Sequence, residues 1–276
     1  MFPRIDWKAA LLRGALVLSL VSPFAAAPAL AAPCGDDGAG FSAWLADFKR
    51  GAVAQGISAR TVSAALDGAS YDTGVIRLDR NQKHFAVSFE QFIQNRVTAG
   101  RIAQGKQKMK QYADVLARIE RQFGVPAPIL VAIWGMETDY GANQGKKPIF
   151  PSLATLAYDC RRADFFTDQL LAALRVADRG DVAIADMRGA WAGEMGQTQF
   201  MPKSYYQFAV DFDGNGRRDL IRSAPDALAS TANYLRGYGW SGMSWSNGAN
   251  AGALAGWNKA TVYQQALAYF ASRLVE

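Results

Sequence analysis

The sequence lacks the compositional biases of disordered, collagen-like and polytopic membrane proteins. Only 20% of its 276 residues are charged and 50% are apolar, while 26 glycines and 10 prolines amount to ordinary use without low complexity. No internal repeat or homopolymer tract is present. These absences predict a globular protein with one large domain or two smaller ones, and with a sizeable core.

Basic residues do not gather into a stripe. The 30 Lys and Arg residues exceed the 24 Asp and Glu residues modestly, which gives a formal net charge of +6. Loss of an N-terminal leader would take away three basic residues and one acidic residue, so the charge would fall to about +4. Such a balance can favour an anionic polymer, but without a basic stripe it argues against nucleic acid as a partner.

The N-terminus has the features of a secretory signal peptide over residues 1–31. Basic residues precede an apolar run over 14–21, and a small-residue tract then ends in Ala-Leu-Ala, which predicts cleavage near Ala31. An uncleaved membrane anchor is the alternative, but the apolar run is well short of the roughly 20 residues that span a bilayer. A lipidated Cys34 is disfavoured, because Pro33 stands where a lipoprotein signal has a small residue. We therefore expect export.

Cysteine is scarce, since Cys34 and Cys160 are the only two. In an oxidising compartment they can form one disulfide between the start of the mature chain and its middle. Two unpaired buried thiols are the alternative, while a metal or redox motif would need a closer spacing. We expect the disulfide, because exposed free thiols are a liability outside the cytosol.

The rest of the chain has the periodicity of a helical protein. Apolar residues recur at spacings of three and four between residues 41 and about 109. A longer helix is expected over about 104–123, and the next one begins at once because Pro126 and Pro128 are tolerated only in a first turn. Further helices are expected over about 227–235 and 261–274, with a loop over 237–256 between them.

Glu137 is the first residue with a chemical signature. Ile129, Ile133 and Glu137 stand four residues apart on one helix stripe, so the carboxyl group points toward the apolar core. Burial and the negative end of the helix both disfavour the ionised form, which predicts a raised pKa and a proton available near neutrality. Such a group is a candidate catalytic acid, and the alternative is a structural partner for an arginine or a backbone group.

A glycine-rich segment over residues 189–202 is the second candidate. Three glycines within eight residues permit a close approach of the backbone. Gln199, Phe200 and Met201 follow and offer an amide and a wide apolar face, which complements a sugar ring. A tight loop between two core helices is the alternative, and composition does not separate the two.

An acidic loop over residues 211–219 matches positions 1, 3, 5, 6 and 9 of an EF-hand calcium loop. Position 12 is Arg222 where a bidentate glutamate is required, and Asp226 could serve only in a longer loop. Weak calcium binding and a solvated turn without metal both remain open, and in either case we expect a structural role. The candidate ligands are Asp211, Asp213, Asn215 and Asp219.

These segments, in this order, resemble the lytic murein transglycosylases of the membrane-bound lytic transglycosylase B type. The resemblance rests on VP (125–126), WGMETDYG (134–141), SLATLAY (152–158), WAGEMG (191–196), QFMP (199–202), DFDGNG (211–216), ANYL (232–235) and GW (239–240). It covers nearly the whole mature chain. The protein would be a soluble, short variant, because the segment after Trp240 leaves little room for a β-rich insertion.

The resemblance implies a mainly α protein with little β structure. Residues 32–110 would form an N-terminal helical region, and residues 111–276 a lysozyme-like transglycosylase core with the EF-hand-like loop at 211–222. It also implies a periplasmic enzyme that cleaves the β-1,4 bond between N-acetylmuramic acid and N-acetylglucosamine in peptidoglycan without water, leaving 1,6-anhydro ends. Its partner would be the glycan strand. No cofactor would be required, a structural Ca²⁺ is compatible with the loop, and the sequence identifies no cell-wall enzyme partner.

Matched to the motif of this family, Glu137 is the catalytic acid and base. It would protonate the glycosidic oxygen and then take the proton from the muramoyl 6-hydroxyl. The resemblance assigns seven residues to glycan binding: Gln199, Phe200, Met201, Tyr234, Asn258, Tyr263 and Phe92. The chain departs from the family where Ala190 replaces a serine near the acid, and where Phe92 and Trp257 replace tyrosines.

Two other functions stay open on this evidence. A peptidoglycan-binding or scaffold protein on the same fold would have lost catalysis. Ordinary hydrolysis would need a second carboxylate to hold a water molecule, and Glu194 and Asp139 are the nearest candidates in the sequence. We expect Glu194 to form a structural salt bridge instead.

Overall fold

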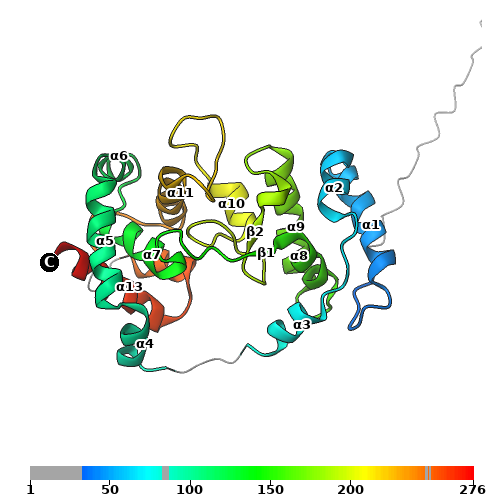
Figure 1. The fold of residues 1–276 in the computed structure, drawn as a ribbon, viewed down its shortest axis with the longest axis horizontal. Coiled ribbons are helices and arrows are strands. Elements are labelled where there is room, and N and C mark those ends of the chain that lie inside the picture. Colours follow the sequence, from blue (N-terminus) through cyan, green and yellow to red (C-terminus); the bar gives the residue numbers. More distant parts are fainter. Residues whose placement is uncertain (1–32, 83–86, 246–247, 249) are drawn as a thin grey trace, which may run out of the picture. The chain divides into compact units, whose positions relative to one another are not determined.

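The computed structural model describes residues 33–82, 87–245, 248 and 250–276, and Figure 1 shows how their helices are arranged. The predicted signal peptide over 1–31 lies outside these residues. The described residues belong to one compact unit, Ala31–Glu276. They form thirteen α-helices, one 3-10 helix (Ile184–Asp186) and two strands of two residues each, so the predicted mainly α fold is confirmed. None of the described helices is long and apolar enough to cross a membrane.

The first three helices pack against the middle of the chain. These are α1 (Phe41–Ala54), α2 (Ala59–Leu66) and α3 (Thr73–Arg80), and they contact α8 (Ile149–Tyr158) or α9 (Ala163–Asp178) (Figure 1). Phe41 and Tyr71 both pack edge-to-face on Tyr158, with ring centroids 5.6 and 5.9 Å apart. Ser58 and Asp72 accept hydrogen bonds from the first turns of α2 and α3, which fixes where these helices begin.

A second group of helices packs around α7 (Ala127–Thr138) and α13 (Thr261–Val275). It consists of α4 (Phe89–Arg96), α5 (Ala99–Gln111), α6 (Ala113–Phe123) and α11 (Ala224–Gly237). As predicted, α7 begins at the two prolines, with Pro126 as its N-cap and Pro128 in its first turn. Nearly every residue of α7 is buried, because α5, α6, α11 and α13 all contact it. A helix enclosed in this way holds the side chains of its last turn in place.

The predicted helix over 104–123 is wrong in two respects. It begins earlier, because the Thr98 side chain accepts a hydrogen bond from the Arg101 backbone N–H at 3.2 Å and so caps α5. It also breaks at Tyr112, which separates α5 from α6 with a φ of −109°. The Tyr112 ring packs edge-to-face on Trp134 at 5.5 Å, so a tertiary contact accompanies the break. The predicted domain boundary at residue 110 falls inside α5 and stays a prediction.

The remaining elements are two short strands and two short helices. They are β1 (Lys147–Pro148), which pairs antiparallel with β2 (Arg188–Gly189), and the helices α10 (Pro202–Phe208) and α12 (Ala251–Trp257). Helix α12 occupies part of the segment that was predicted as a loop over 237–256. That prediction is wrong there because Ala253 and Leu254 are buried in the core, and burial stabilises a helical turn that local composition does not indicate.

Cys34 and Cys160 form the predicted disulfide, with Cα atoms 5.0 Å apart across 126 positions of sequence. Next to Cys160 lies a group of charged residues that we call the Asp79 network: Asp79, Arg80, Asp159, Arg161 and Arg162. Asp79 is 2% exposed and pairs with all three arginines, while Arg80 also pairs with Asp159 at 2.7 Å. The network joins α3 to the connection between α8 and α9.

Candidate active site

Glu137 lies in the last turn of α7, where the helix ends in three residues with left-handed backbone. Asp139, Tyr140 and Gly141 have φ values of 51°, 59° and 87°. The Gly141 N–H donates to Thr138 Oγ1 at 2.8 Å, which closes the turn. Non-glycine residues adopt this backbone only when their surroundings enforce it. The end of α7 is therefore held in one conformation, and this fixes the direction of Glu137.

Two side chains from the C-terminal part of the chain hold one oxygen of Glu137. Trp257 Nε1 donates to Glu137 Oε1 at 3.2 Å, and the Tyr263 hydroxyl donates to the same oxygen. These partners are 120 and 126 positions away in the sequence, at the end of α12 and in α13. Within the described part of the chain no hydrogen bond reaches Oε2. That oxygen is the one available to a ligand.

Burial raises the pKa of Glu137 above its ordinary value, and this effect is the largest acting on the group. The hydrogen bonds from Tyr263 and Trp257 and the positive charge of Arg96 act in the opposite direction, while the carboxyl group of Glu194 raises the pKa further. A raised pKa favours a proton on Glu137 near neutral pH, in agreement with the sequence analysis. The group has the electrostatics of a general acid.

Glu137 faces a cleft with a volume of about 370 Å³. Its lining contains five of the seven residues that the sequence analysis assigned to glycan binding: Gln199, Phe200, Met201, Tyr234 and Asn258. The other lining residues are Ala190, Glu194, Ser204 and Trp257. The cleft thus brings together the end of α7, the 189–202 segment, α10, α11 and the end of α12.

Tyr263 and Phe92, the other two residues assigned to glycan binding, are not part of this lining. Tyr263 is buried and donates to Glu137, and the Phe92 ring packs edge-to-face on Tyr263 with centroids 6.4 Å apart. Their role in glycan binding stays a prediction. The contacts instead give Tyr263 a part in positioning the acid, and Phe92 a part in positioning Tyr263.

Three aromatic rings form one wall of the cleft. Phe200 packs edge-to-face on Tyr234 and on Trp257, with centroid distances of 5.7 and 5.4 Å, and Tyr234 meets Trp257 at 5.1 Å. The Tyr234 hydroxyl donates to the Gly256 carbonyl at 2.7 Å, which fixes its ring. Such a wall offers a rigid apolar face with polar edges, which suits a sugar ring.

The glycines of the 189–202 segment allow the chain to pack on itself. A Cβ at Gly189 would lie 1.8 Å from the Glu194 carbonyl oxygen, and a Cβ at Gly193 would lie 2.5 Å from Leu153. The close approach expected from the sequence is therefore made to protein atoms, as in the tight-loop interpretation. Gln199 Nε2 donates to two backbone carbonyls at 2.9 and 3.1 Å, so this cleft residue is also held in place.

Of the two carboxyl groups considered for hydrolysis, only Glu194 lines the cleft. Asp139 pairs with Arg101 and accepts a hydrogen bond from Asn143 Nδ2 at 2.9 Å. Burial would raise the pKa of Asp139, but these partners outweigh burial and hold the pKa below its ordinary value. Asp139 is thus an ion-pair partner away from the cleft.

The salt bridge expected for Glu194 is wrong for the described residues. Arg162 attracts Glu194 through its charge, but the Arg162 guanidinium pairs with Asp79, and no ion pair in the described ranges includes Glu194. Burial raises the pKa of Glu194, with the Arg162 charge and backbone N–H groups acting in the opposite direction. Glu194 is therefore a second carboxyl group of the cleft that lacks a paired cation.

Ser204 was not predicted from the sequence, and Trp257 had no predicted role in the site. Ser204 lies in α10, three positions after Met201, and only that helical spacing could have placed it in the cleft. Trp257 directly precedes Asn258, and its indole N–H reaches Glu137 through tertiary packing that no local pattern reveals.

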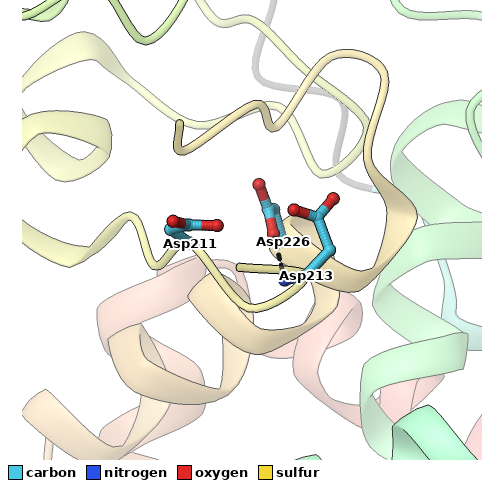
Figure 2. A group of neighbouring side chains, drawn as sticks. All are labelled: Asp211, Asp213 and Asp226. Carbon is cyan, nitrogen blue, oxygen red and sulfur yellow. Dashed lines mark hydrogen bonds between the residues drawn. The ribbon is translucent and has the colours of Figure 1, made fainter. Parts of the chain in front are cut away.

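The 211–219 loop wraps around a buried aspartate. Asp226 is fully buried, and its two oxygens accept the backbone N–H groups of Phe212, Asp213 and Asp219 at 2.8 to 3.2 Å. Figure 2 shows Asp226 beside Asp211 and Asp213, and each of the three carboxylates brings one oxygen within 4.8 Å of the others. Three carboxylates this close fit a calcium ion, which takes oxygen ligands.

The grouped carboxylates differ from the predicted ligand set. Asp219 is not one of the three grouped carboxylates, and its Oδ1 accepts the backbone N–H groups of Ile221 and Arg222 at 3.0 and 2.9 Å. Asn215 Oδ1 accepts the Arg217 N–H at 2.9 Å, and its part in a cation site stays a prediction. Arg222, at position 12, pairs with Asp186 at 2.5 Å and offers no oxygen. A cation here would rest on Asp211, Asp213 and Asp226, and would crosslink the loop.

Comparison with known proteins gives a family and close structural relatives. The transglycosylase SLT domain family matches residues 40–251. Over 145 residues, 52% of this chain, the sequence is 40% identical to membrane-bound lytic murein transglycosylase B of Escherichia coli K12. This match spans 40% of the length of that relative.

Two solved structures share the fold. SltB3 from Pseudomonas aeruginosa in complex with NAG-anhNAM-pentapeptide matches with a TM-score of 0.80 and 33% identity, over 85% of this chain and 79% of that chain. The Escherichia coli lytic transglycosylase Slt35 in complex with calcium matches with a TM-score of 0.75 and 26% identity, over 84% of this chain and 92% of that chain. The family match covers most of the chain, including the acid and most of the cleft lining, and the chain therefore belongs to the transglycosylase SLT domain family.

Proposed function

We propose that the protein is a lytic transglycosylase, which cleaves the β-1,4 bond between N-acetylmuramic acid and N-acetylglucosamine of peptidoglycan and leaves 1,6-anhydro ends. The observation that carries the proposal is Glu137, a largely enclosed acid of raised pKa at the wall of the cleft, with Oε1 held by Trp257 and Tyr263. The names of the Escherichia coli and Pseudomonas relatives, and the anhydro sugar bound in the latter, support the same reaction.

One carboxyl group suffices for this chemistry. Glu137 in its protonated form, which the raised pKa favours, donates its proton to the glycosidic oxygen as the C–O bond breaks. The resulting carboxylate then takes the proton of the muramoyl 6-hydroxyl while that oxygen forms a bond to C1, so the acid is regenerated and no water is consumed. Hydrogen bonds to Oε1 stabilise the carboxylate stage, because Trp257 and Tyr263 already donate there.

Hydrolysis needs a second group that is ionised and holds a water molecule. Asp139 is paired with Arg101 away from the cleft lining, and Glu194 is in the cleft but its burial without a paired cation disfavours the ionised form. These two observations favour the intramolecular 6-hydroxyl over water as the nucleophile.

The glycan would lie along the cleft against Gln199, Phe200, Met201, Tyr234 and Asn258. Export to the periplasm fits the N-terminal sequence and the peptidoglycan substrate. A calcium ion at Asp211, Asp213 and Asp226 would be structural, since this loop supplies no residue to the cleft lining.

Digestion of purified peptidoglycan by the mature chain, with mass spectrometry of the new glycan ends, tests this function. Anhydro ends are the expected product, and the Glu137→Gln variant serves as the inactive control. Reducing ends would indicate hydrolysis. Binding to peptidoglycan without any product would indicate a lapsed enzyme, and either result would contradict the proposal.

A further inference from the structure

Glu194 is held rigidly in the wall of the cleft that contains Glu137. The Ala190 N–H donates to the Glu194 carbonyl at 2.8 Å, and the Gly193 N–H donates to the Ala190 carbonyl at 3.2 Å, so residues 190–194 form a tight turn. Gly193 has a φ of 94°, and a larger residue there would collide with neighbouring side-chain atoms. The Glu194 side chain therefore starts from a fixed backbone.

Most polar side chains of the cleft already have protein partners. Glu137 Oε1 accepts from two donors, the Tyr234 hydroxyl donates to a carbonyl, and the Gln199 side-chain nitrogen donates to two. Four buried side-chain polar atoms in the described ranges have no hydrogen-bond partner. Only one of them, Glu194 Oε2, belongs to a residue of the cleft lining. An unsatisfied buried polar atom is costly to stability, and its presence next to a ligand cleft indicates a function.

The surroundings of Glu194 decide the kind of hydrogen bond that it can make. The charged side chains that act on it are Glu137, across the cleft lining, and Arg162, which is engaged by Asp79. Without a paired cation, burial raises the pKa of an enclosed carboxyl group, and the protonated form can both donate and accept a hydrogen bond. Hydroxyl and acetamido groups of an amino sugar offer partners for both. Ala190, beside Glu194 in the turn, offers no side-chain hydrogen bond of its own.

We infer that Glu194 is a second functional carboxyl group of this cleft, which hydrogen-bonds the N-acetylated sugar beside Glu137 and so positions the bond to be cleaved. It acts in its uncharged form, as a substrate-binding residue and neither as a base nor as a nucleophile. This inference rests on the proposed function for the identity of the ligand.

Two substitutions of matched length test the inference. Glu194→Gln keeps an uncharged side chain that donates and accepts, whereas Glu194→Met keeps the volume and removes the hydrogen bond. With short glycan strands as substrate, we expect Glu194→Met to lower kcat/KM by about 10-fold, as the loss of one hydrogen bond can. Glu194→Gln should restore most of that loss. Glu276→Met, at the exposed end of the chain, controls for the substitution itself.

Thermal melting separates this role from a structural one. Because Oε2 has no partner in the protein and the carboxyl group loses only hydrogen bonds from the Glu194 and Ala192 backbone, Glu194→Met should melt within a few degrees of the unsubstituted chain. A fall in kcat/KM smaller than threefold in Glu194→Met would overturn the inference. So would an equal loss in Glu194→Gln, since that would mean that the titrating proton is needed.

Binding distinguishes failure of this inference from failure of the proposed function. In a Glu137→Gln background, Glu194→Met should weaken binding of the same glycan strands by about the same factor, measured by calorimetry. If the unsubstituted chain released no anhydro products, the proposed function would fail while the binding comparison still reported on Glu194. If binding were unchanged by Glu194→Met, the inference would fail whatever the products.

Discussion

Asp79 in its network and Glu137 in the cleft are both enclosed carboxyl groups, yet their surroundings shift their pKa values in opposite directions. Burial would raise the pKa of Asp79, but hydrogen bonds and charge from Arg161 and Arg162 outweigh burial and lower it. Burial also raises the pKa of Glu137, and there the opposing hydrogen bonds and the charge of Arg96 are too weak to reverse it. Asp79 has paired cations that outweigh burial, whereas Glu137 has none.

The difference in pKa shift gives Asp79 a structural role and Glu137 a chemical one. Asp79 is ionised and holds α3 against the α8–α9 connection, beside the disulfide at Cys160. Glu137 has no ion pair in the described ranges and its pKa is raised, which favours the protonated state that a general acid needs. Substitutions in the two regions should therefore have opposite signatures, one in stability and the other in turnover.

The largest effect is expected on turnover. Glu137→Gln keeps the shape and the acceptor for Trp257 and Tyr263 but removes the transferable proton. We expect turnover to fall by roughly 10²- to 10⁴-fold, as for the loss of a general acid. Release of anhydro products, normalised to the amount of folded protein, measures this. Near-normal turnover in this variant would remove Glu137 from the mechanism.

The disulfide should have the largest effect on stability. It closes a loop of 126 positions, which in the chain-entropy model stabilises the fold by about 5 kcal/mol at most. Replacing both cysteines by serine should lower the melting temperature by roughly 10 °C and leave turnover at low temperature unchanged. Titration of the denatured, unreduced chain provides the direct check. Two reactive thiols per chain would contradict the bridge.

Asp79→Asn should destabilise by a smaller amount. The three arginines are 36% to 40% exposed at their side chains, so water replaces part of the lost interaction and we expect about 2 kcal/mol. Because the folded pKa of Asp79 is lowered, its contribution is present above the unfolded pKa and is lost as the pH falls through the folded pKa. The deficit of the variant in melting temperature should thus shrink in acid. A deficit that is constant from neutral pH to about pH 3 would show that charge is not its cause.

The inward direction of Glu137, the disulfide and the start of α7 could all be predicted from the sequence. The stripe of Ile129, Ile133 and Glu137 predicted an inward acid, because a helix period brings residues four apart onto one face. The disulfide followed from there being only two cysteines. Pro126 indicated where α7 begins, because a helix tolerates proline only at its start.

Tertiary contacts account for the features that the sequence did not reveal. The break at Tyr112 lies in a continuous helical pattern, and α12 depends on burial of Leu254. Trp257 and Tyr263 reach Glu137 across 120 and 126 positions, and no local signal encodes such a meeting. The missing ion pair of Glu194 likewise depends on the engagement of Arg162 elsewhere in the fold, by Asp79.

The raised pKa of Glu137 predicts a small gain in stability when the acid is removed. Because the folded pKa of Glu137 is raised above the unfolded one, the natural chain loses stability as the pH rises from the unfolded pKa toward the folded pKa, whereas below the unfolded pKa the group is protonated in both states and costs nothing. Glu137→Gln should therefore be more stable than the natural chain at neutral pH, by about 1 kcal/mol as is common for a single stabilising substitution, and equally stable below about pH 4. Melting curves across this range test the sign. A less stable variant at neutral pH would mean that the hydrogen bonds to Oε1 need the charge.

The smallest effect is expected from calcium. Asp226 already accepts three backbone N–H groups, and Arg222 supplies no ligand, so a cation at Asp211, Asp213 and Asp226 should bind weakly. With a Kd of about 10⁻⁴–10⁻³ M, as in weak calcium modules, 1 mM calcium would stabilise by roughly 0.4–1.4 kcal/mol.

A chelator should then lower the melting temperature by a few degrees at most and leave turnover intact, because no step of the proposed reaction uses a cation. Asp211→Asn is the matched control, since it should abolish the response of the melting temperature to calcium while keeping an oxygen that accepts the Gly214 and Asn215 N–H groups and losing only the acceptor for Gly216. If folded protein lost turnover in chelator and regained it with calcium, the 211–219 loop would be required for turnover. It would then not be a purely structural region separate from the cleft.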